Sequence, residues 1–186
     1  MTESDVESTA DNTTEDLPQR DVLVVGGGVA GLTAALFTAR AGLETLAVDG
    51  DESILRRNAH LENFPGFPGG VNPRLFADML HTQATRNGVD LVEGHITSVE
   101  HAASGEGFVA TAADGSRVRA DRVIAASWAD SEYLDSLGPN TRTAGSKSFL
   151  EDDGHGRTNV EGLYAEGDVI HAYAACTCGQ SYSEKW

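Results

Sequence analysis

Three glycines at a fixed spacing give this sequence its clearest chemical signal. Gly26, Gly28 and Gly31 form a G-x-G-x-x-G pattern between the apolar run VLVV and a stretch of good helix formers. In such a turn the first glycine permits the tight bend, the second lets the backbone approach a pyrophosphate, and the third lets helix and strand pack closely. The first helical N–H groups, at Val29 and Ala30, attract phosphates together with the positive end of the helix dipole. The pattern therefore predicts a dinucleotide site at the start of this helix.

An acidic residue follows at the distance that such a site requires. Asp49 ends the next apolar run, 18 residues after Gly31, and Gly50 follows it. A carboxylate at this place accepts hydrogen bonds from the ribose hydroxyls of an adenosine and repels a 2′-phosphate, which disfavours NADP. We assign Asp49 and Gly50 to the cofactor site. The alternative, a glycine turn used only for packing, gives no reason for the acid.

Three further stretches separate FAD from NAD. They are ENFPGFPGG at 62–70, the helical segment LFADMLHTQATRNGVDL at 75–91, and GRTNVEGLYAEGDV at 156–169. With the glycine turn they resemble the FAD half of the thioredoxin-reductase family of flavoproteins, over about residues 20–130 and 144–170. The resemblance implies FAD as cofactor, with Asn63 hydrogen-bonded near the flavin ring. It also implies that Gly167 and Asp168 meet the ribityl chain and pyrophosphate; the alternative for EGD is an ordinary polar turn. Glu166 departs from the family's alanine and adds a negative charge near the pyrophosphate.

The sequence also departs from that family where a second domain is normally inserted. The strand that ends in A-T-G in the family reads VIAASWAD here, with Ser127 and Trp128 in place of the Thr-Gly pair. We expect Trp128 to fill the core; stacking near the adenine or the flavin is the alternative. No second G-x-G-x-x-G occurs, and the family's C-x-x-C is absent. Cys176 and Cys178 are interpreted as an incidental pair. We interpret His155 and His171 as surface histidines, with general acids near the flavin as the alternative, so the catalytic residues stay unassigned; we expect no metal site.

The elements that must position these residues follow from apolar periodicity and turn residues. A strand–helix–strand unit, parallel and right-handed, carries the glycine turn, and a helix begins at Asn72-Pro73 and ends at Asn87-Gly88. We expect strands at 21–25, 45–49, 91–99, 108–112, 117–120, 122–126 and 163–165, and helices at 29–41 and from about Val169. Asp114-Gly115 predicts a hairpin. The fold class is therefore α/β, a Rossmann-like FAD-binding domain with a parallel sheet and a small β-hairpin or meander insertion.

The composition limits which partners and which cellular compartment suit the chain. The chain of 186 residues has 29 acidic and 13 basic side chains and a formal net charge of −16, which argues against nucleic acid as a partner. Because salt screens the repulsion between these negative charges, we interpret the chain as a protein of a salt-rich, haloarchaeal cytoplasm. The alternative is an ordinary acidic protein of a mesophile. No apolar run is long enough to span a bilayer, and no signal peptide precedes the fold, so we expect no membrane partner and a cytoplasmic protein. Residues 1–19 are expected to form a disordered acidic tail before a single FAD-binding domain at 20–186 with no inserted NAD(P)H domain.

The leading functional hypothesis is a FAD-binding flavoprotein oxidoreductase that resembles thioredoxin reductase but lacks its NADPH domain and C-x-x-C. Its unknown electron donor would be NAD(P)H or a redox protein, and it could form a homodimer or bind a partner subunit. One alternative is a non-catalytic dinucleotide-binding module or a subunit of a larger flavoprotein. The other is an NAD-binding oxidoreductase, which leaves the stretches 62–70 and 162–169 unexplained.

Overall fold

A seven-stranded sheet organises the chain, and its central strands are parallel. The computed structural model describes residues 17–50, 53–128, 130–144 and 147–170. The strands are β1 (Gln19–Val25), β2 (Thr45–Asp49), β3 (Asp90–Glu93), β4 (Ile96–His101), β5 (Phe108–Ala112), β6 (Arg117–Ala125), β7 (Thr141–Ala144), β8 (Lys147–Leu150) and β9 (Leu163–Ala165). The helices are α1 (Val29–Arg40), α2 (Ile54–Arg57) and α3 (Pro73–Arg86), with short 3₁₀ helices η2 (Glu132–Leu137) and η3 (Gly167–Val169).

The strand order brings the predicted strand–helix–strand unit to the middle of the sheet. The order is β3-β2-β1-β6-β5-β4, and β9 also pairs with β6. β1 lies between β2 and β6 and is parallel to both, with Val25 opposite Val48 on one side and Ala125 on the other. The carboxyl ends of these three strands therefore meet at one edge, where ligands bind in open α/β sheets. This arrangement confirms the predicted Rossmann-like fold class.

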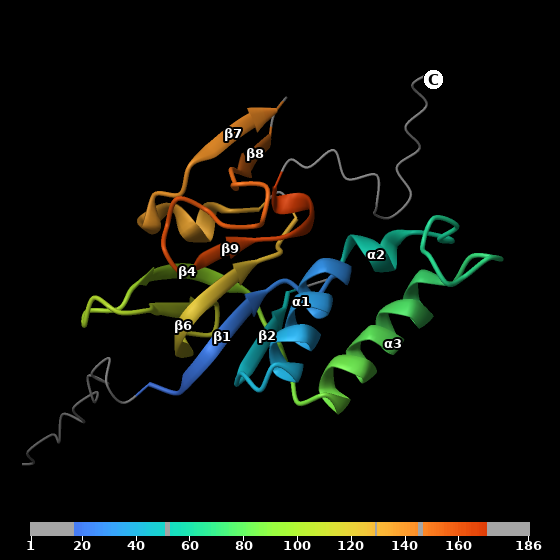
Figure 1. Cartoon of the computed structure of the whole chain (residues 1–186), viewed down its shortest axis with the longest axis horizontal. Coiled ribbons are helices and arrows are strands. Elements are labelled where there is room, and N and C mark those ends of the chain that lie inside the picture. The colour runs from blue at the N-terminus through green and yellow to red at the C-terminus, as the bar shows by residue number, and fades with distance from the viewer. Residues whose placement is uncertain (1–16, 51–52, 129, 145–146, 171–186) are drawn as a thin grey trace, which may run out of the picture.

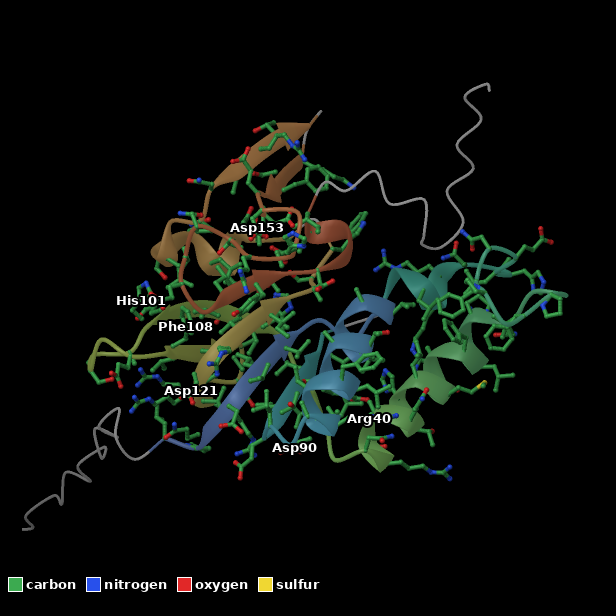
Figure 2. The ribbon with its side chains drawn as sticks, viewed as in Figure 1. Arg40, Asp90, His101, Phe108, Asp121 and Asp153 are labelled. Atoms are coloured by element: carbon green, nitrogen blue, oxygen red, sulfur yellow. The ribbon has the colours of Figure 1, made fainter. Side chains whose placement is uncertain are left out.

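Two apolar layers cover the two faces of the sheet. Figure 1 shows α1 against the sheet and α3 beside α1, and on this side Val22, Val24 and Ala47 pack with Leu32 and Ala35. The opposite face carries the larger core, in which strand residues pack against η2 and the β7–β8 region. Figure 2 shows Phe108 at the β4–β5 pair, where it is buried and stacks with His101 of the neighbouring strand at 5.4 Å between ring centroids.

The helix expected after the Pro- and Gly-rich loop forms as its sequence predicts. The Asn72 side chain accepts hydrogen bonds from the Arg74 and Leu75 backbone N–H groups, and Pro73 occupies the first turn. Gly88 has φ +92° and follows the C-cap. The packed face of α3 contains Phe76, Ala77 and Ala84. Of the apolar residues at helical spacing, Leu75 and Met79 are instead exposed.

Several expected elements differ in extent. Residues 117–120 and 122–126 belong to one strand, β6, because its first half pairs with β5 and its second half with β9. The β-like stretch 91–99 forms two separate strands at opposite edges of the sheet, since β3 pairs with β2 and β4 pairs with β5. The poorly patterned region holds η2 and the β7–β8 hairpin. The helix expected from Val169 is a 3₁₀ turn that ends there, and Ile170 is extended.

Three expectations fall wholly or mostly outside the described residues: the acidic tail before β1, the Cys176 and Cys178 pair, and the continuation beyond Ile170. Within the described ranges, no helix is both long and apolar enough to cross a membrane.

Candidate functional site

A cavity of about 340 Å³ lies where the carboxyl ends of β1, β2 and β6 meet. Its volume is within the range of small-molecule and cofactor sites. It is lined by the glycine turn and the start of α1 (Gly26, Gly27, Gly28, Val29, Ala30), by the end of β2 and α2 (Asp49, Gly50, Ser53, Leu55, Arg57), by the β3–β4 link (Gly94, His95, Ile96), by the end of β6 (Ala126, Ser127, Trp128, Asp130, Tyr133) and by Gly167.

Each glycine of the turn occupies its position for a different structural reason. Gly26 has φ +121°, and a Cβ there would meet the Ala126 carbonyl, so only glycine fits this bend. A Cβ at Gly31 would meet the Gly26 carbonyl, which lets the helix pack closely on the strand. Gly28 differs, because among the described residues only Ser53 Oγ would lie within 4 Å of a Cβ there, at 3.7 Å. The space beside Gly28 therefore opens into the cavity.

The N-terminus of α1 faces this cavity without a side-chain cap. Gly28 is its N-cap residue, and no side chain hydrogen-bonds to the N–H groups of the first turn in the part of the chain that is described. The first turn, which includes Val29 and Ala30, also contains no acidic residue. Backbone N–H groups at such an end are available to an anion, and the helix dipole favours negative charge there.

Asp49 lies against the glycine turn at the end of β2. Its carboxyl group occupies the place that a Cβ at Gly27 would take, and the nearby Gly27 N–H acts to lower the pKa of this carboxyl group. Burial raises the pKa of the Asp49 carboxyl above its ordinary value, while the positive charges of His81 and Arg56 oppose that rise. The neighbouring Gly50 lies close to the β3–β4 link. A Cβ built on Gly50 would lie 3.4 Å from His95 Nδ1.

A histidine of α3 contacts the same carboxylate. His81 Nε2 lies 3.1 Å from Asp49 Oδ2, and the two side chains are only 25% and 15% exposed. The nitrogen is buried and has no hydrogen-bond partner among the described residues, so its approach to the carboxylate is a close polar contact rather than a hydrogen bond. The Asp49 carboxyl group thus lies between the glycine turn and α3.

The end of β6 forms the opposite wall. The Ser127 hydroxyl donates to the Asp130 carbonyl at 2.5 Å and pairs with the Tyr133 hydroxyl at 2.9 Å. Burial raises the pKa of the Tyr133 phenol, which therefore stays neutral. Trp128 has φ +55°, the one positive φ among the described non-glycine residues, and Lys147 Nζ lies 3.8 Å from the centroid of its ring. The expectation that Trp128 fills the core is wrong, because it is 42% exposed and lines the cavity.

The second motif reaches the site through Gly167. This residue has φ +71°, and its Cβ position lies 2.8 Å from the Ala30 side chain, so the EGD turn touches the start of α1. Asp168 follows in η3. Glu166 is not among the cavity-lining residues; its Oε1 lies 3.4 Å from the Cβ position of Gly156. Asn63 is exposed and does not line the cavity.

The structure thus brings together most of the residues singled out in the sequence, at one cavity. Those lining it are Gly26, Gly28, Val29, Ala30, Asp49, Gly50 and Gly167, whereas Gly31 packs behind the turn and Asn63 lies outside.

Sequence reasoning missed Gly27, His81 and the wall formed by Ser127 and Tyr133. Helical spacing offered a signal for His81, because it lies four residues after the buried Ala77 and three before Ala84.

These features fit the adenosine diphosphate part of a dinucleotide. Gly28 leaves room for a diphosphate beside an uncapped helix N-terminus. Asp49 offers a carboxylate at the adjacent strand end, where a ribose would lie. The described residues contain no cluster of metal-ligating side chains.

Comparisons with known proteins agree with this geometry. Residues 21–60 match the FAD binding domain family, and residues 143–186 match a family of unknown function, DUF5807. The chain is 38% identical over 108 residues to thioredoxin reductase of Streptomyces coelicolor, which covers 56% of this chain and 33% of that protein. It is 33% identical over 122 residues to thioredoxin reductase of Listeria monocytogenes, covering 63% and 36%. The chain therefore spans about a third of the length of the curated relatives that it matches.

Solved structures give the same result. The atypical thioredoxin reductase TRi from Desulfovibrio vulgaris Hildenborough has a TM-score of 0.55 and 30% identity, over 60% of this chain and 37% of that one. An oxidoreductase from Agrobacterium tumefaciens shares the fold, with a TM-score of 0.72 over 82% of this chain and 90% of that one, at 17% identity. The resemblance seen in the sequence is confirmed: the chain carries a thioredoxin-reductase-like FAD-binding region, and the matched domain indicates FAD.

Proposed function

We propose that this chain is a flavoprotein oxidoreductase that binds FAD in the cavity at the end of β1, β2 and β6. The observation that carries the proposal is the meeting of the two motifs, since Gly167 of the second motif touches Ala30 in the glycine turn of the first. Two motifs distant in sequence but adjacent at one cavity are expected when both contact one extended ligand. The flavin would carry the redox chemistry, and the protein would supply binding and orientation.

The site residues divide by the part of FAD that they would contact. Gly26, Gly28 and the N–H groups of Val29 and Ala30 would hold the diphosphate. Asp49 and Gly50 would contact the adenosine ribose, with Gly31 providing close helix packing.

On the flavin side, Gly167 and Asp168 would meet the ribityl chain, and Asn63 would approach the ring. The placement of Asn63 outside the cavity gives this last assignment the least support.

The test is retention of FAD. Protein purified in high salt is mixed with FAD, desalted into the same buffer and examined by visible absorption. The proposal expects retained flavin absorbance at near 1:1 stoichiometry and bleaching on anaerobic titration with NADH, NADPH or a reduced redox protein. A colourless protein after desalting, with no affinity for FAD by calorimetry, would refute FAD binding. Bound FAD that no donor reduces would refute the oxidoreductase role.

One observation favours a second candidate, a FAD-binding subunit whose redox partner is another chain. Between β6 and β9 the chain has η2 and the β7–β8 hairpin but no second glycine motif of the dinucleotide-binding type. We therefore infer that the NAD(P)H domain that the resemblance implies at this position would be supplied by a separate chain. Size-exclusion chromatography of the protein drawn from its native extract distinguishes a homodimer, a stoichiometric heteromer and a monomer.

The cellular setting belongs to the same proposal. With a net charge of −16, the chain is suited to a salt-rich cytoplasm and ill suited to a nucleic-acid partner. The division into an acidic tail at 1–19 and one FAD-binding domain at 20–186 is proposed on composition, although Gln19 itself belongs to β1 and pairs with β6.

A further inference from the structure

The contact between His81 and Asp49 links α3 to the floor of the cavity. His81 lies one turn after the buried Ala77 on α3, and its side chain, 25% exposed, reaches Asp49 at the end of β2. Its Nε2 is buried and lies 3.1 Å from Asp49 Oδ2. A buried ring nitrogen requires a polar partner, and among the described residues the Asp49 carboxylate is the one in contact with it.

We propose that His81 is a positioning residue that fixes the Asp49 carboxylate for the ribose 2′-hydroxyl of the bound nucleotide, and so makes the site selective for an unmodified adenosine ribose. This inference rests on the proposed function, because it requires the cavity to hold an adenosine nucleotide.

The carboxylate is held from two sides and open on a third. The Gly27 backbone lies against it from the turn, and His81 contacts it from α3. An ionised carboxylate has about four acceptor positions, so these two contacts leave capacity for a ribose hydroxyl on the cavity side. A carboxylate held in one orientation loses less freedom when the nucleotide binds, and its hydrogen bond to the hydroxyl is correspondingly better aligned.

Other charges near Asp49 do not replace His81. Arg56 attracts Asp49 electrostatically, but its guanidinium is paired with Asp78 at 2.9 Å. Glu93, in β3, is a like charge and opposes ionisation of Asp49. Direct contact with the carboxylate therefore comes from His81 among the charged side chains described.

The experiment compares ADP with 2′-deoxy-ADP in calorimetric titrations of the full chain in high salt. The variants are His81→Leu, which fills the space without a nitrogen, and His81→Gln, which retains an N–H donor. His155→Leu, at an exposed histidine that does not line the cavity, is the matched control. Circular dichroism verifies that each variant is folded.

We expect the wild type to bind ADP about tenfold more tightly than 2′-deoxy-ADP, the effect of one hydrogen bond to a charged acceptor. In His81→Leu this ratio falls to twofold or less, whereas His81→Gln and His155→Leu retain it. A merely structural role for His81 would weaken both nucleotides equally and leave the ratio unchanged, which would overturn the inference. A wild type that binds FAD but binds ADP and 2′-deoxy-ADP equally tightly would overturn it as well, with the proposed function intact. A wild type that binds neither FAD nor ADP would instead refute the proposed function itself.

Discussion

Replacing Gly28 with alanine separates folding from binding at the glycine turn. Gly28 has φ −79° and ψ −174°, which any residue adopts, and the new Cβ would have ordinary contact with Ser53 Oγ at 3.7 Å. Alanine is a poorer N-cap than glycine by about 0.5–1 kcal/mol. Alanine also lowers the entropy of the unfolded chain, which stabilises the folded protein by about 0.4–1 kcal/mol. The net change in the free energy of unfolding is therefore close to zero. The added methyl group would stand in the space where the diphosphate approaches the backbone.

The expected result is a folded Gly28→Ala protein that binds FAD roughly ten- to a hundredfold more weakly. That range corresponds to the loss of one charge-assisted hydrogen bond, about 1.5–3 kcal/mol. FAD affinity is measured by flavin fluorescence titration, and stability by urea unfolding at the same salt concentration. Gly27→Ala is the matched control: its Cβ would overlap the Asp49 carboxyl group, so it should lose about 1–3 kcal/mol of stability. Wild-type FAD affinity in Gly28→Ala would refute the idea that the diphosphate lies against this turn.

Three further outcomes are expected. Because burial raises the pKa of Asp49 above 3.8, its ionisation is less favourable in the folded chain, and the resulting loss of stability grows as pH rises above that value. Asp49→Asn should therefore raise the melting temperature at pH 7 while weakening FAD binding; a lower melting temperature would contradict this. Trp128→Gly should be about 1 kcal/mol more stable than Trp128→Ala in urea unfolding, since both lose the Lys147 contact and only glycine accommodates φ +55° without strain. The wild-type melting temperature should rise by several degrees between about 0.1 and 1 M KCl, where the Debye length falls from about 10 to 3 Å; a salt-independent value would contradict the self-repulsion argument.

The sequence predicted the fold well where local signals agree with tertiary packing. The glycine turn, the helix at Val29 and the strand at Thr45–Asp49 carry apolar periodicity, turn residues and the acid together, and the structure forms them at those positions. The Asn72 cap also forms as expected.

Prediction failed where strand identity depends on partners elsewhere in the chain. Nothing local indicates that 117–120 and 122–126 form one strand, because β5 and β9 make β6 continuous by pairing with its two halves.

The sequence predicts that the glycine turn and Asp49 lie together, but it does not predict the residues after β6 that line the same cavity. Trp128 looked like a core residue because tryptophan usually is, yet a turn with positive φ at the end of β6 directs it to the cavity. Ser127 and Tyr133 meet only after η2 folds back, a contact that no spacing rule gives. The Asn63 assignment came from resemblance alone, and the chain places that residue on an exposed loop.

The contact between Gly167 and Ala30 has a consequence for how the protein is made. The glycine turn is synthesised before Gly167, and its cavity lacks Gly167 until β9 has been made and has paired with β6. At about 5–20 residues per second, the ribosome needs several seconds to add the intervening chain. During that interval the nascent chain can form the β1–α1–β2 unit, yet it exposes the edge of β1 until β6 arrives. The complete cavity therefore forms only after β9 has been made, and slow translation between β1 and β6 would prolong the exposure of the β1 edge.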